Sequence, residues 1–349
     1  MRVAVGMSGG VDSSVTAALL KEQGHNVTGV FIEAYNEPGC RTDEDKRDAL
    51  RVATQLGIPF QVLDLRKEYK ATVVKYFFGE YLSGRTPNPD VVCNREVKFG
   101  LFYDWAIKRG FANVATGHYA RITEDGQLQQ PVDLTKDQSY FLWQVPREHL
   151  TRVMWPLGEM TKQHVRAYAK HLKLPNADKP DSMGVCMLGE LNVRAFLHQH
   201  LGEQPGDVIW NGRVVGNHEG LWFYTIGQRG GWEYSTGVQT EKMPSLYVID
   251  KHVDRHELVI GLHGEAWRTS FTIVDHQLWG GGALSVRIRN LGEIVNVTDM
   301  TLLKGGQWRV NTDRPLYGPA AGQSAVFYSK GVVVGGGILS VSQTTQITR

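Results

Sequence analysis

The chain has 349 residues, of which 42% are hydrophobic and 21% are charged, and its formal net charge is +2. This composition excludes an intrinsically disordered chain, and the length favours two or three domains. A net charge so close to zero does not by itself indicate a nucleic-acid-binding protein, so any surface for an RNA partner must be local.

The first half of the chain alternates strand and helix patterns. Strands are predicted at 2–6, 26–32, 60–63 and 113–116, and helices at 12–23, 43–56, 67–82, 99–109 and 161–172. A turn-rich loop is predicted at 83–93. This alternation is typical of βαβ units and predicts an α/β fold with a doubly wound parallel sheet. Ligands of such sheets bind beyond the carboxyl ends of the strands.

The second part of the chain has a different character. After about Leu201 the helical periodicity disappears, and short β-branched and aromatic segments dominate, as at 221–226, 246–249 and 285–289. Triple glycines at 280–282 and 335–337 are interpreted as breaks between strands. This pattern is typical of small β-barrels or sandwiches.

Cysteine usage and the N-terminus predict the compartment. Cys40, Cys93 and Cys186 are too few, and odd in number, for a secreted disulfide framework. They are scattered singly, without a C-x-x-C pair, so we expect no structural zinc and no metal site built by the protein alone. No apolar run approaches the ~18 residues of a membrane span. The first residues lead directly into a glycine-rich motif, so we expect no targeting peptide, no membrane partner and a cytoplasmic protein.

The glycine-rich motif, Ser8–Ser13, lies between the first strand and the first helix. Its two glycines permit positive φ and a close approach of backbone N–H groups to a ligand, and the helix N-terminus favours an anion. The motif lacks the lysine of the Walker pattern. Asp12 would repel phosphates unless a divalent cation lay between them, so Mg²⁺ is expected with the nucleotide. The alternative is a glycine turn with a serine or aspartate N-cap.

Two further polar segments each contain a cysteine. Residues 87–94 combine two stiffening prolines with Asp90 and Cys93, and residues 181–186 end in Cys186. A lone cysteine is more often a small buried hydrophobe, but two of them in polar, turn-rich segments favour thiol chemistry. Cys40 has no partner chemistry and is interpreted as structural or incidental.

Together these segments resemble the tRNA-specific 2-thiouridylases, a family of pyrophosphatase-loop ATPases. The matching segments lie in the family's order along nearly the whole chain, at 6–13, 86–98, 115–121, 136–142, 181–190, 216–229, 319–328 and 335–338. The resemblance implies an ATP-binding domain of the adenine nucleotide α-hydrolase type at 1–200, a small central β domain at 201–264 and a C-terminal β-barrel at 265–349.

The resemblance also implies roles for individual residues. The predicted ATP-binding residues are Gly6, Met7, Ser8, Gly9, Gly10, Val11, Asp12, Ser13, Ile32 and Gly117. The predicted target-base residues are Asn88, Pro89 and Asp90. The predicted tRNA-binding residues are Lys136, Asp137, Gln138, Arg289 and Asn290. Cys186 is expected to carry a persulfide, Cys93 to be the partner nucleophile, and Asp90 to be a general base or a group that orients the target base.

Some positions depart from the family pattern. Met183, Met187 and Leu188 are packing changes beside Cys186, and Ile32 stands where methionine is usual. The segment 287–291 lacks an aromatic residue and a cation of the family's Arg-Tyr-Arg, so a solvated strand face is an equal alternative for Arg289 and Asn290.

The implied reaction explains why ATP and two thiols occur together. The C2 carbonyl of a uridine is a poor electrophile without a leaving group, and adenylation makes AMP the leaving group. Sulfur then arrives from the Cys186 persulfide, either by direct attack or as hydrosulfide released when Cys93 forms a disulfide with Cys186. The expected partners are tRNA, in particular the tRNAs for Lys, Glu and Gln, and a persulfide donor such as a cysteine desulfurase or a sulfur-relay protein.

Two other functions compete with this interpretation. Another adenylating ligase or amidotransferase could use the same loop, but it would not need Cys93 and Cys186. A non-catalytic tRNA- or nucleotide-binding module would bind tRNA without turning over ATP. Asp12, Asp90 and the two thiols argue against the second alternative.

Overall fold

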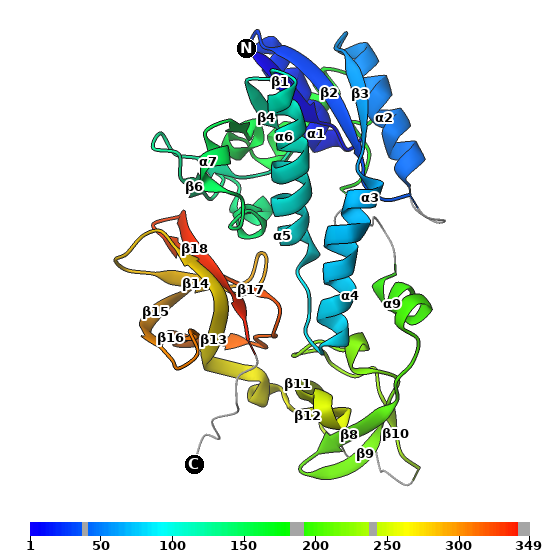
Figure 1. Ribbon diagram of the computed structural model, residues 1–349, viewed down its shortest axis with the longest axis vertical. Coiled ribbons are helices and arrows are strands. Elements are labelled where there is room, and N and C mark those ends of the chain that lie inside the picture. The colour runs from blue at the N-terminus through cyan, green and yellow to red at the C-terminus, as the bar shows by residue number, and fades with distance from the viewer. Residues whose placement is uncertain (37–40, 182–191, 237–242, 341–349) are drawn as a thin grey trace. The chain divides into compact units, whose positions relative to one another are not determined.

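The computed structural model describes residues 1–36, 41–181, 192–236 and 243–340, and the chain forms two compact units (Figure 1). The first unit comprises Met1–Lys75, Pro89–Leu191 and Tyr328–Val334. The second comprises Tyr76–Asn88, Asn192–Phe327 and Gly335–Arg349. Each unit therefore contains segments that are distant in the sequence.

A five-stranded sheet forms the centre of the first unit. Its strands are β1 (Arg2–Gly6), β2 (Asn26–Glu33), β3 (Phe60–Asp64), β4 (Asn113–Ala115) and β7 (Val153–Met154). They lie in the order β3-β2-β1-β4-β7, and every neighbouring pair is parallel. The predicted α/β fold with a parallel sheet is confirmed.

Helices α1 (Val11–Glu22), α2 (Thr42–Gln55) and α8 (Lys162–His171) pack on this sheet through one shared core. Val5, Val15 and Val165 each contribute a fully buried side chain to that core. Burial of a side chain of this size is worth about 1.5–3 kcal/mol. Helix α1 is buried on nearly every side, whereas α2 and α8 bury one face each, with Ala49, Val52 and Ala53 in α2 and Val165 and Ala169 in α8.

Two long helical stretches follow the third strand. The first runs through α3 (Arg66–Tyr69), the π-helical turn η1 (Lys70–Val74) and α4 (Lys75–Leu82). The second runs through α5 (Pro89–Cys93), η2 (Asn94–Leu101) and α6 (Phe102–Lys108). The predicted loop at 83–93 is therefore wrong for its last five residues, because Pro89 opens a helix. Proline suits a first helical position, where its missing N–H would have no intrahelical partner.

Short elements complete the first unit. They are β5 (Arg121–Ile122), β6 (Leu128–Gln129), η3 (Leu134–Lys136), η4 (Ser139–Phe141), α7 (Arg147–Leu150) and η5 (Pro156–Glu159). The segment 328–334 joins this unit through a pairing of Val332 with Gln129.

The second unit contains a small β domain. It follows α9 (Val193–Leu201), and its strands are β8 (Gly206–Trp210), β9 (Arg213–His218), β10 (Glu233–Tyr234), β11 (Leu246–His252) and β12 (Glu257–Leu262), ordered β10-β9-β8-β12-β11. Short helical turns η6 (Leu221–Phe223) and η8 (Val253–Arg255) lie between these strands, and η9 (His263–Ala266) follows the last of them. The β-like segment at 221–226 does not form a strand, because it begins with the helical turn η6. Residues 221–224 are all buried, which a tight turn permits but a strand with one covered face does not.

A closed barrel follows the small β domain, and its residues belong to the second unit except for 328–334, which belong to the first. Its strands are β13 (Trp267–Leu278), β14 (Ser285–Arg287), β15 (Val295–Leu302), β16 (Trp308–Tyr317), β17 (Ser324–Ser329) and β18 (Val332–Leu339). They lie in the order β13-β16-β15-β14-β17-β18, and a β13–β18 pairing closes the ring, so the predicted C-terminal barrel is confirmed.

The glycines at 335–337 lie inside β18, so the break predicted there is wrong. A Cβ on Gly335 would lie 2.1 Å from the Gln277 carbonyl oxygen, so glycine lets β18 approach β13. Within the part of the chain that the structure describes, no helix is long and apolar enough to span a bilayer.

Candidate functional site

The Ser8–Ser13 loop connects β1 to α1 and is closed by its own hydrogen bonds. The Ser8 N–H donates to Ser13 Oγ at 3.1 Å, and this hydroxyl donates to the Gly10 carbonyl at 3.1 Å. Gly9 has φ of 79°, and a Cβ there would lie 2.3 Å from the Asp45 carbonyl oxygen. Both the backbone conformation and the close packing against α2 therefore require glycine.

The N-terminus of α1 is not capped by a side chain. Gly10 is the N-cap residue, and it makes no side-chain cap bond. The simple N-cap alternative is therefore not what the structure shows. Asn176 supports the loop from outside, because its Nδ2 donates to the Gly9 carbonyl at 2.8 Å and to Ser14 Oγ at 2.9 Å. A helix that begins with uncapped N–H groups behind a rigid glycine turn is suited to binding phosphate.

Asp12 lies at the centre of a polar cluster. Lys162 Nζ lies 2.7 and 2.9 Å from its two carboxylate oxygens, and the Tyr119 hydroxyl donates to it at 2.9 Å. Burial, together with the Asp12 charge, raises the pKa of Tyr119 far above its ordinary value, so this hydroxyl stays protonated and donates.

Asp181 is a second carboxylate in this cluster. Its Oδ1 lies 2.7 Å from Lys162 Nζ and accepts a bond from Arg166, and its Oδ2 lies 2.9 Å from Lys136 Nζ. Burial alone would raise the pKa of Asp181, but the hydrogen bonds and charges of Lys162 and Lys136 outweigh it and hold the pKa well below the usual range. Lys162 thus lies between two carboxylates, at the first residue of α8.

Sequence reasoning missed Lys162 and Tyr119. One signal was available for the lysine, because a cation at the first position of a helix is opposed by the helix dipole. Such a placement calls for a local anion, which Asp12 and Asp181 supply.

The other predicted ATP residues follow the carboxyl ends of the strands. Gly6 ends β1, Ile32 is the half-buried penultimate residue of β2, and Gly117 lies two residues beyond β4. A Cβ on Gly117 would lie 2.7 Å from Ser13 N and 2.8 Å from the carbonyl carbon of Asp12. Gly117 therefore permits contact with the first turn of α1, and these residues lie together at the edge where a parallel sheet binds ligands.

His118 belongs to a buried hydrogen-bonded group beside this edge. Its Nδ1 lies 2.7 Å from Thr116 Oγ1, which also accepts from Trp155 Nε1 at 3.0 Å, and its Nε2 lies 3.4 Å from Lys98 Nζ. Burial and the Lys98 charge hold the pKa of His118 well below its ordinary value. A neutral ring that donates through Nδ1 and accepts from Lys98 satisfies all these contacts, so His118 has a structural role in this group.

Helix α5 carries Pro89, Asp90 and Cys93. Cys93 is completely buried and Asp90 is half-buried. Asn88, which precedes the helix, is 5% exposed, and its N–H donates to the Tyr76 hydroxyl at 3.2 Å. Cys186 and Cys40 lie outside the described residues, so the predicted pairing of Cys93 with Cys186 stays a prediction.

The predicted tRNA-binding segment 136–138 contains one residue with an internal role. Asp137 is completely buried, and its carboxylate accepts bonds from Ser139 N at 2.9 Å and Gln130 Nε2 at 2.7 Å. Its burial favours an indirect role, in which it orders the turn that carries Lys136 and Gln138. Lys136 pairs with Asp181, and Gln138 Oε1 accepts from Tyr119 N at 2.9 Å.

Arg289 holds backbone carbonyls within the second unit. Its guanidinium donates to the carbonyls of Ile226 at 3.0 Å and Gly318 at 2.6 Å. The neighbouring Asn290 has a buried Oδ1 without a hydrogen-bond partner. The solvated strand face considered as an alternative therefore does not describe these two residues.

The geometry defines a class of protein: an α/β nucleotide-binding unit whose glycine loop and helix N-terminus suit phosphate, joined to a small β domain and a closed barrel. Comparison with family models agrees. Residues 1–190 match the tRNA methyl transferase HUP domain, residues 194–262 its PRC-barrel domain, and residues 267–339 the aminomethyltransferase beta-barrel domain.

Curated relatives match the chain along its length. The chain is 41% identical to the tRNA-specific 2-thiouridylase MnmA of Staphylococcus carnosus, covering 96% of this chain and 94% of that one. It is 42% identical to MnmA 1 of Geobacillus kaustophilus, covering 97% and 95%. The chain belongs to the tRNA-specific 2-thiouridylase family.

Solved structures match only part of the chain. The U34-tRNA thiolase NcsA from Methanococcus maripaludis is 20% identical, with a TM-score of 0.37, and covers 58% of this chain and 67% of its own. A 4-thiouridine synthetase in complex with RNA and ATP is also 20% identical, with a TM-score of 0.36, and covers 51% and 42%. These scores are too low to support an argument.

Proposed function

We propose that this protein is a tRNA-uridine 2-sulfurtransferase, which replaces the C2 oxygen of the anticodon wobble uridine with sulfur and forms 2-thiouridine. The observation that carries the proposal is membership, over 96% of the chain, in a family of 2-thiouridylases. The uncapped helix N-terminus and glycine loop support it, because the reaction consumes ATP. The products besides the modified tRNA are AMP and pyrophosphate.

The first half of the reaction activates the uridine. Its C2 oxygen attacks the α-phosphate of ATP, pyrophosphate leaves, and the oxygen becomes part of an AMP leaving group. The glycine loop and the first N–H groups of α1 would hold the phosphates. Lys162 would supply positive charge at the same place, because it already balances Asp12 and Asp181. Tyr119 would keep Asp12 oriented through its 2.9 Å hydrogen bond.

Mg²⁺ is the expected companion of the nucleotide. Asp12 and Asp181 both contact Lys162 Nζ, so two carboxylates approach one position. One or two carboxylates together with phosphate oxygens are the usual Mg²⁺ ligands, so these residues fit the ion. Lys162 Nζ lies between the two carboxylates, so Asp12 and Asp181 would hold the ion once Lys162 turns to the phosphates, and the ion when bound would neutralise charge on the departing pyrophosphate.

The second half delivers sulfur through Cys186 and Cys93. The terminal sulfur of a Cys186 persulfide forms a bond to C2 and AMP leaves. Cys93 thiolate then attacks Cys186 Sγ, which breaks the sulfur–sulfur bond and leaves the outer sulfur on the base. In the other order, Cys93 releases hydrosulfide first, and hydrosulfide attacks C2. Both orders end in a Cys93–Cys186 disulfide, which a dithiol reductant must reduce before the next cycle.

Residues near the start of α5 would bind the target base. Asn88, Pro89 and Asp90 would hold a uridine that has been turned out of its stack. Asp90 would act as general base or orient the base. Cys93 is completely buried, so its reaction requires the surrounding side chains to open when tRNA binds.

The remaining assignments concern partners and organisation. Lys136 and Gln138 would contact tRNA directly, while Asp137 would hold their turn. Arg289 and Asn290 are further candidates for tRNA contact. The expected substrates are the tRNAs for Lys, Glu and Gln, and the expected sulfur source is a cysteine desulfurase or sulfur-relay protein in the cytoplasm. The proposed domains are 1–200, 201–264 and 265–349.

The test is direct. The protein is incubated with tRNA, Mg-ATP and a persulfide source, and the tRNA is digested to nucleosides for mass spectrometry. We expect 2-thiouridine from the wild type and from Cys40→Ser, and none from Cys93→Ser or Cys186→Ser. If the wild type formed no 2-thiouridine but consumed ATP, and both of the latter variants kept that full ATP turnover, another adenylating enzyme would be the better assignment. A methylated uridine would instead favour the reaction named by the HUP-domain family.

A further inference from the structure

The segment that leads to Asn88 is bound by the connection between β16 and β17. The Thr86 N–H donates to the Ala321 carbonyl at 2.8 Å. Gln323 Nε2 donates to the carbonyls of Thr86 at 3.1 Å and Pro87 at 2.8 Å. All these residues belong to the second unit, although more than 230 positions separate them in the sequence.

The connection that carries Gln323 is itself fixed. The Gln323 carbonyl accepts a hydrogen bond from the Leu339 N–H at 2.8 Å, and the Gly322 N–H donates to the Leu339 carbonyl at 2.8 Å. Gly322 has φ of 91°, and a Cβ there would lie 2.7 Å from the Thr86 carbonyl oxygen. Glycine therefore allows the approach, and the barrel strand β18 holds the backbone from which the Gln323 side chain reaches out.

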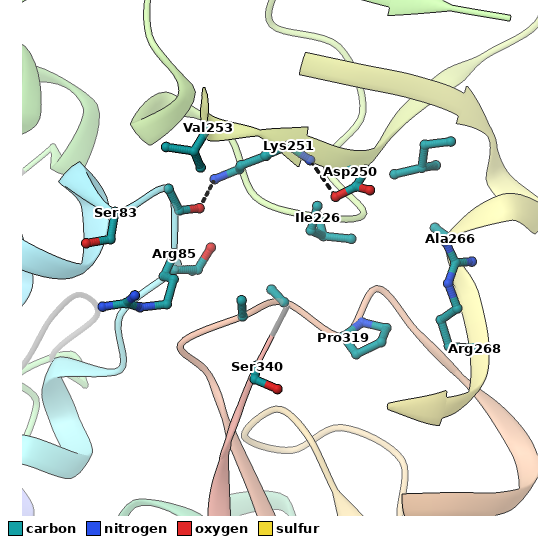
Figure 2. A pocket seen from close by; sticks show the side chains of 15 residues that line it. Ser83, Arg85, Ile226, Asp250, Lys251, Val253, Ala266, Arg268, Pro319 and Ser340 are labelled. Atoms are coloured by element: carbon teal, nitrogen blue, oxygen red, sulfur yellow. Dashed lines mark hydrogen bonds between the residues drawn. The ribbon is translucent and has the colours of Figure 1, made fainter. Parts of the chain in front are cut away.

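The part of the segment before Pro87 is less closely packed than Pro87 and Asn88, which are both buried. A cavity of about 70 Å³, lined by Ser83–Thr86 and by Ala320 and Ala321, lies against it. Figure 2 shows Lys251 reaching across this cavity, where its Nζ donates to the Gly84 carbonyl at 3.3 Å. The backbone carbonyls of Gly84, Thr86 and Pro87 thus each accept a hydrogen bond from a side chain.

We propose that Gln323 is a positioning residue for the target base: from the barrel, its carboxamide fixes the Thr86 and Pro87 carbonyls and so presents Asn88 in the conformation that receives the uridine. The inference rests on the proposed function, in which Asn88 contacts that base. A glutamine is suited to the task because one NH₂ group donates to two carbonyls. Since Asn88 directly follows Pro87, a rotation of the Pro87 peptide would displace it.

Two substitutions separate the hydrogen bonds from simple filling of space. Gln323→Met keeps the length but has no donor. Gln323→Glu presents a carboxylate to two carbonyl oxygens at pH 8, and regains one O–H donor when it is protonated. Because the carbonyls and the partial burial disfavour the charged form, this protonation should occur above the ordinary glutamate pKa of about 4.3. Gln307→Glu, in the β15–β16 turn, is the matched control, since the Gln307 side chain makes no hydrogen bond to the described residues.

Thiolation of tRNA and hydrogen exchange are measured on the full chain. At pH 8 we expect Gln323→Met and Gln323→Glu to lower kcat about 100-fold, the scale of a misplaced reacting group, with the KM for ATP unchanged. The ratio of the Gln323→Glu rate to the wild-type rate should rise as pH falls towards 5.5, and the Gln323→Met ratio should stay flat. Amide exchange at Thr86 and Asn88 should be faster in both variants than in Gln307→Glu.

The outcomes separate the two proposals. A wild type that makes no 2-thiouridine overturns the proposed function, whereas the exchange data still judge the positioning role. Unchanged exchange at Thr86 and Asn88 overturns the positioning role, and so does a kcat loss that merely follows the fraction of unfolded protein. The positioning role is also overturned if the ratio of the Gln323→Glu rate to the wild-type rate does not depend on pH.

Discussion

Lys162→Met tests the central charge of the nucleotide site. Lys162 Nζ lies 2.7 Å from an oxygen of Asp12 and 2.7 Å from an oxygen of Asp181, and its side chain is 14% exposed. Methionine keeps most of the length of lysine but removes the charge. The variant therefore leaves two carboxylates without their shared cation at the place where we expect phosphates to bind.

The size of the effect follows from the exposure of the partners. Breaking a fully buried ion pair costs about 3–5 kcal/mol, and an exposed pair is worth at most about 1 kcal/mol. The Asp12 and Asp181 side chains are 31% and 36% exposed, so solvent compensates part of the loss. We expect the free energy of unfolding to fall by about 1–2 kcal/mol. A lost hydrogen bond to a charged phosphate, at about 1.5–3 kcal/mol, weakens ATP binding about 10- to 100-fold.

Calorimetric titration with Mg-ATP and urea unfolding measure the two quantities. Lys170→Met is the matched control on the same helix, because Lys170 and its partner Asp178 are 63% and 85% exposed. This control should change unfolding by less than about 1 kcal/mol and leave ATP binding intact. If Lys162→Met bound ATP as tightly as the wild type does, Lys162 would have no role in holding phosphate.

Three further substitutions, the first with a matched control, test other parts of the structure. Gly117→Ala places a Cβ 2.7 Å from a backbone nitrogen of α1, so we expect the free energy of unfolding to fall by about 1–3 kcal/mol and ATP binding to weaken. The control is Gly79→Ala in helix α4, where a Cβ meets nothing within 4 Å. This control should raise the free energy of unfolding by about 0.5–1 kcal/mol in the same urea titration. Asn176→Asp replaces the amide that donates to the Gly9 carbonyl with a carboxylate. We expect the free energy of unfolding in urea to fall by about 1–3 kcal/mol and ATP binding to weaken. Wild-type values for both would show that this amide does not support the Ser8–Ser13 loop. Burial lowers the pKa of Lys251 from 10.5 to about 7, so the unfolded chain binds this proton more tightly and stability should rise between these pH values. Lys251→Met should flatten that rise in urea titrations at pH 7 and pH 9, and an unchanged slope would show that another group causes it.

Local patterns predicted most of the first unit. The strands at 2–6 and 26–32 were predicted within a residue or two because each is a short, continuous apolar run, and the helix at 43–56 because its buried residues lie on one face. Positive φ at Gly9 was also foreseeable, since the turn from β1 into α1 is short. Pro89 was misassigned, because proline signals both a loop and the first turn of a helix.

Contacts between distant segments left no local pattern. Asp12 and Lys162 are 150 residues apart, and their ion pair depends on α8 packing beside α1. The burial of Asp137 is a second feature that the local sequence did not predict. A polar residue in a turn is usually exposed, yet this carboxylate is completely buried and hydrogen-bonded to Ser139 and Gln130. Partners of this kind are set by tertiary packing, which periodicity does not encode.

The path of the chain suggests how recognition and chemistry are joined. The second unit includes Tyr76–Asn88, and the first resumes at Pro89, the opening residue of the helix that ends in Cys93. The segment that Gln323 fixes therefore continues, after Asn88, into the helix that carries Asp90 and the thiol. Only the peptide bond between Asn88 and Pro89 separates the proposed base-binding segment from this helix, and the proline ring fixes φ at the first helical residue.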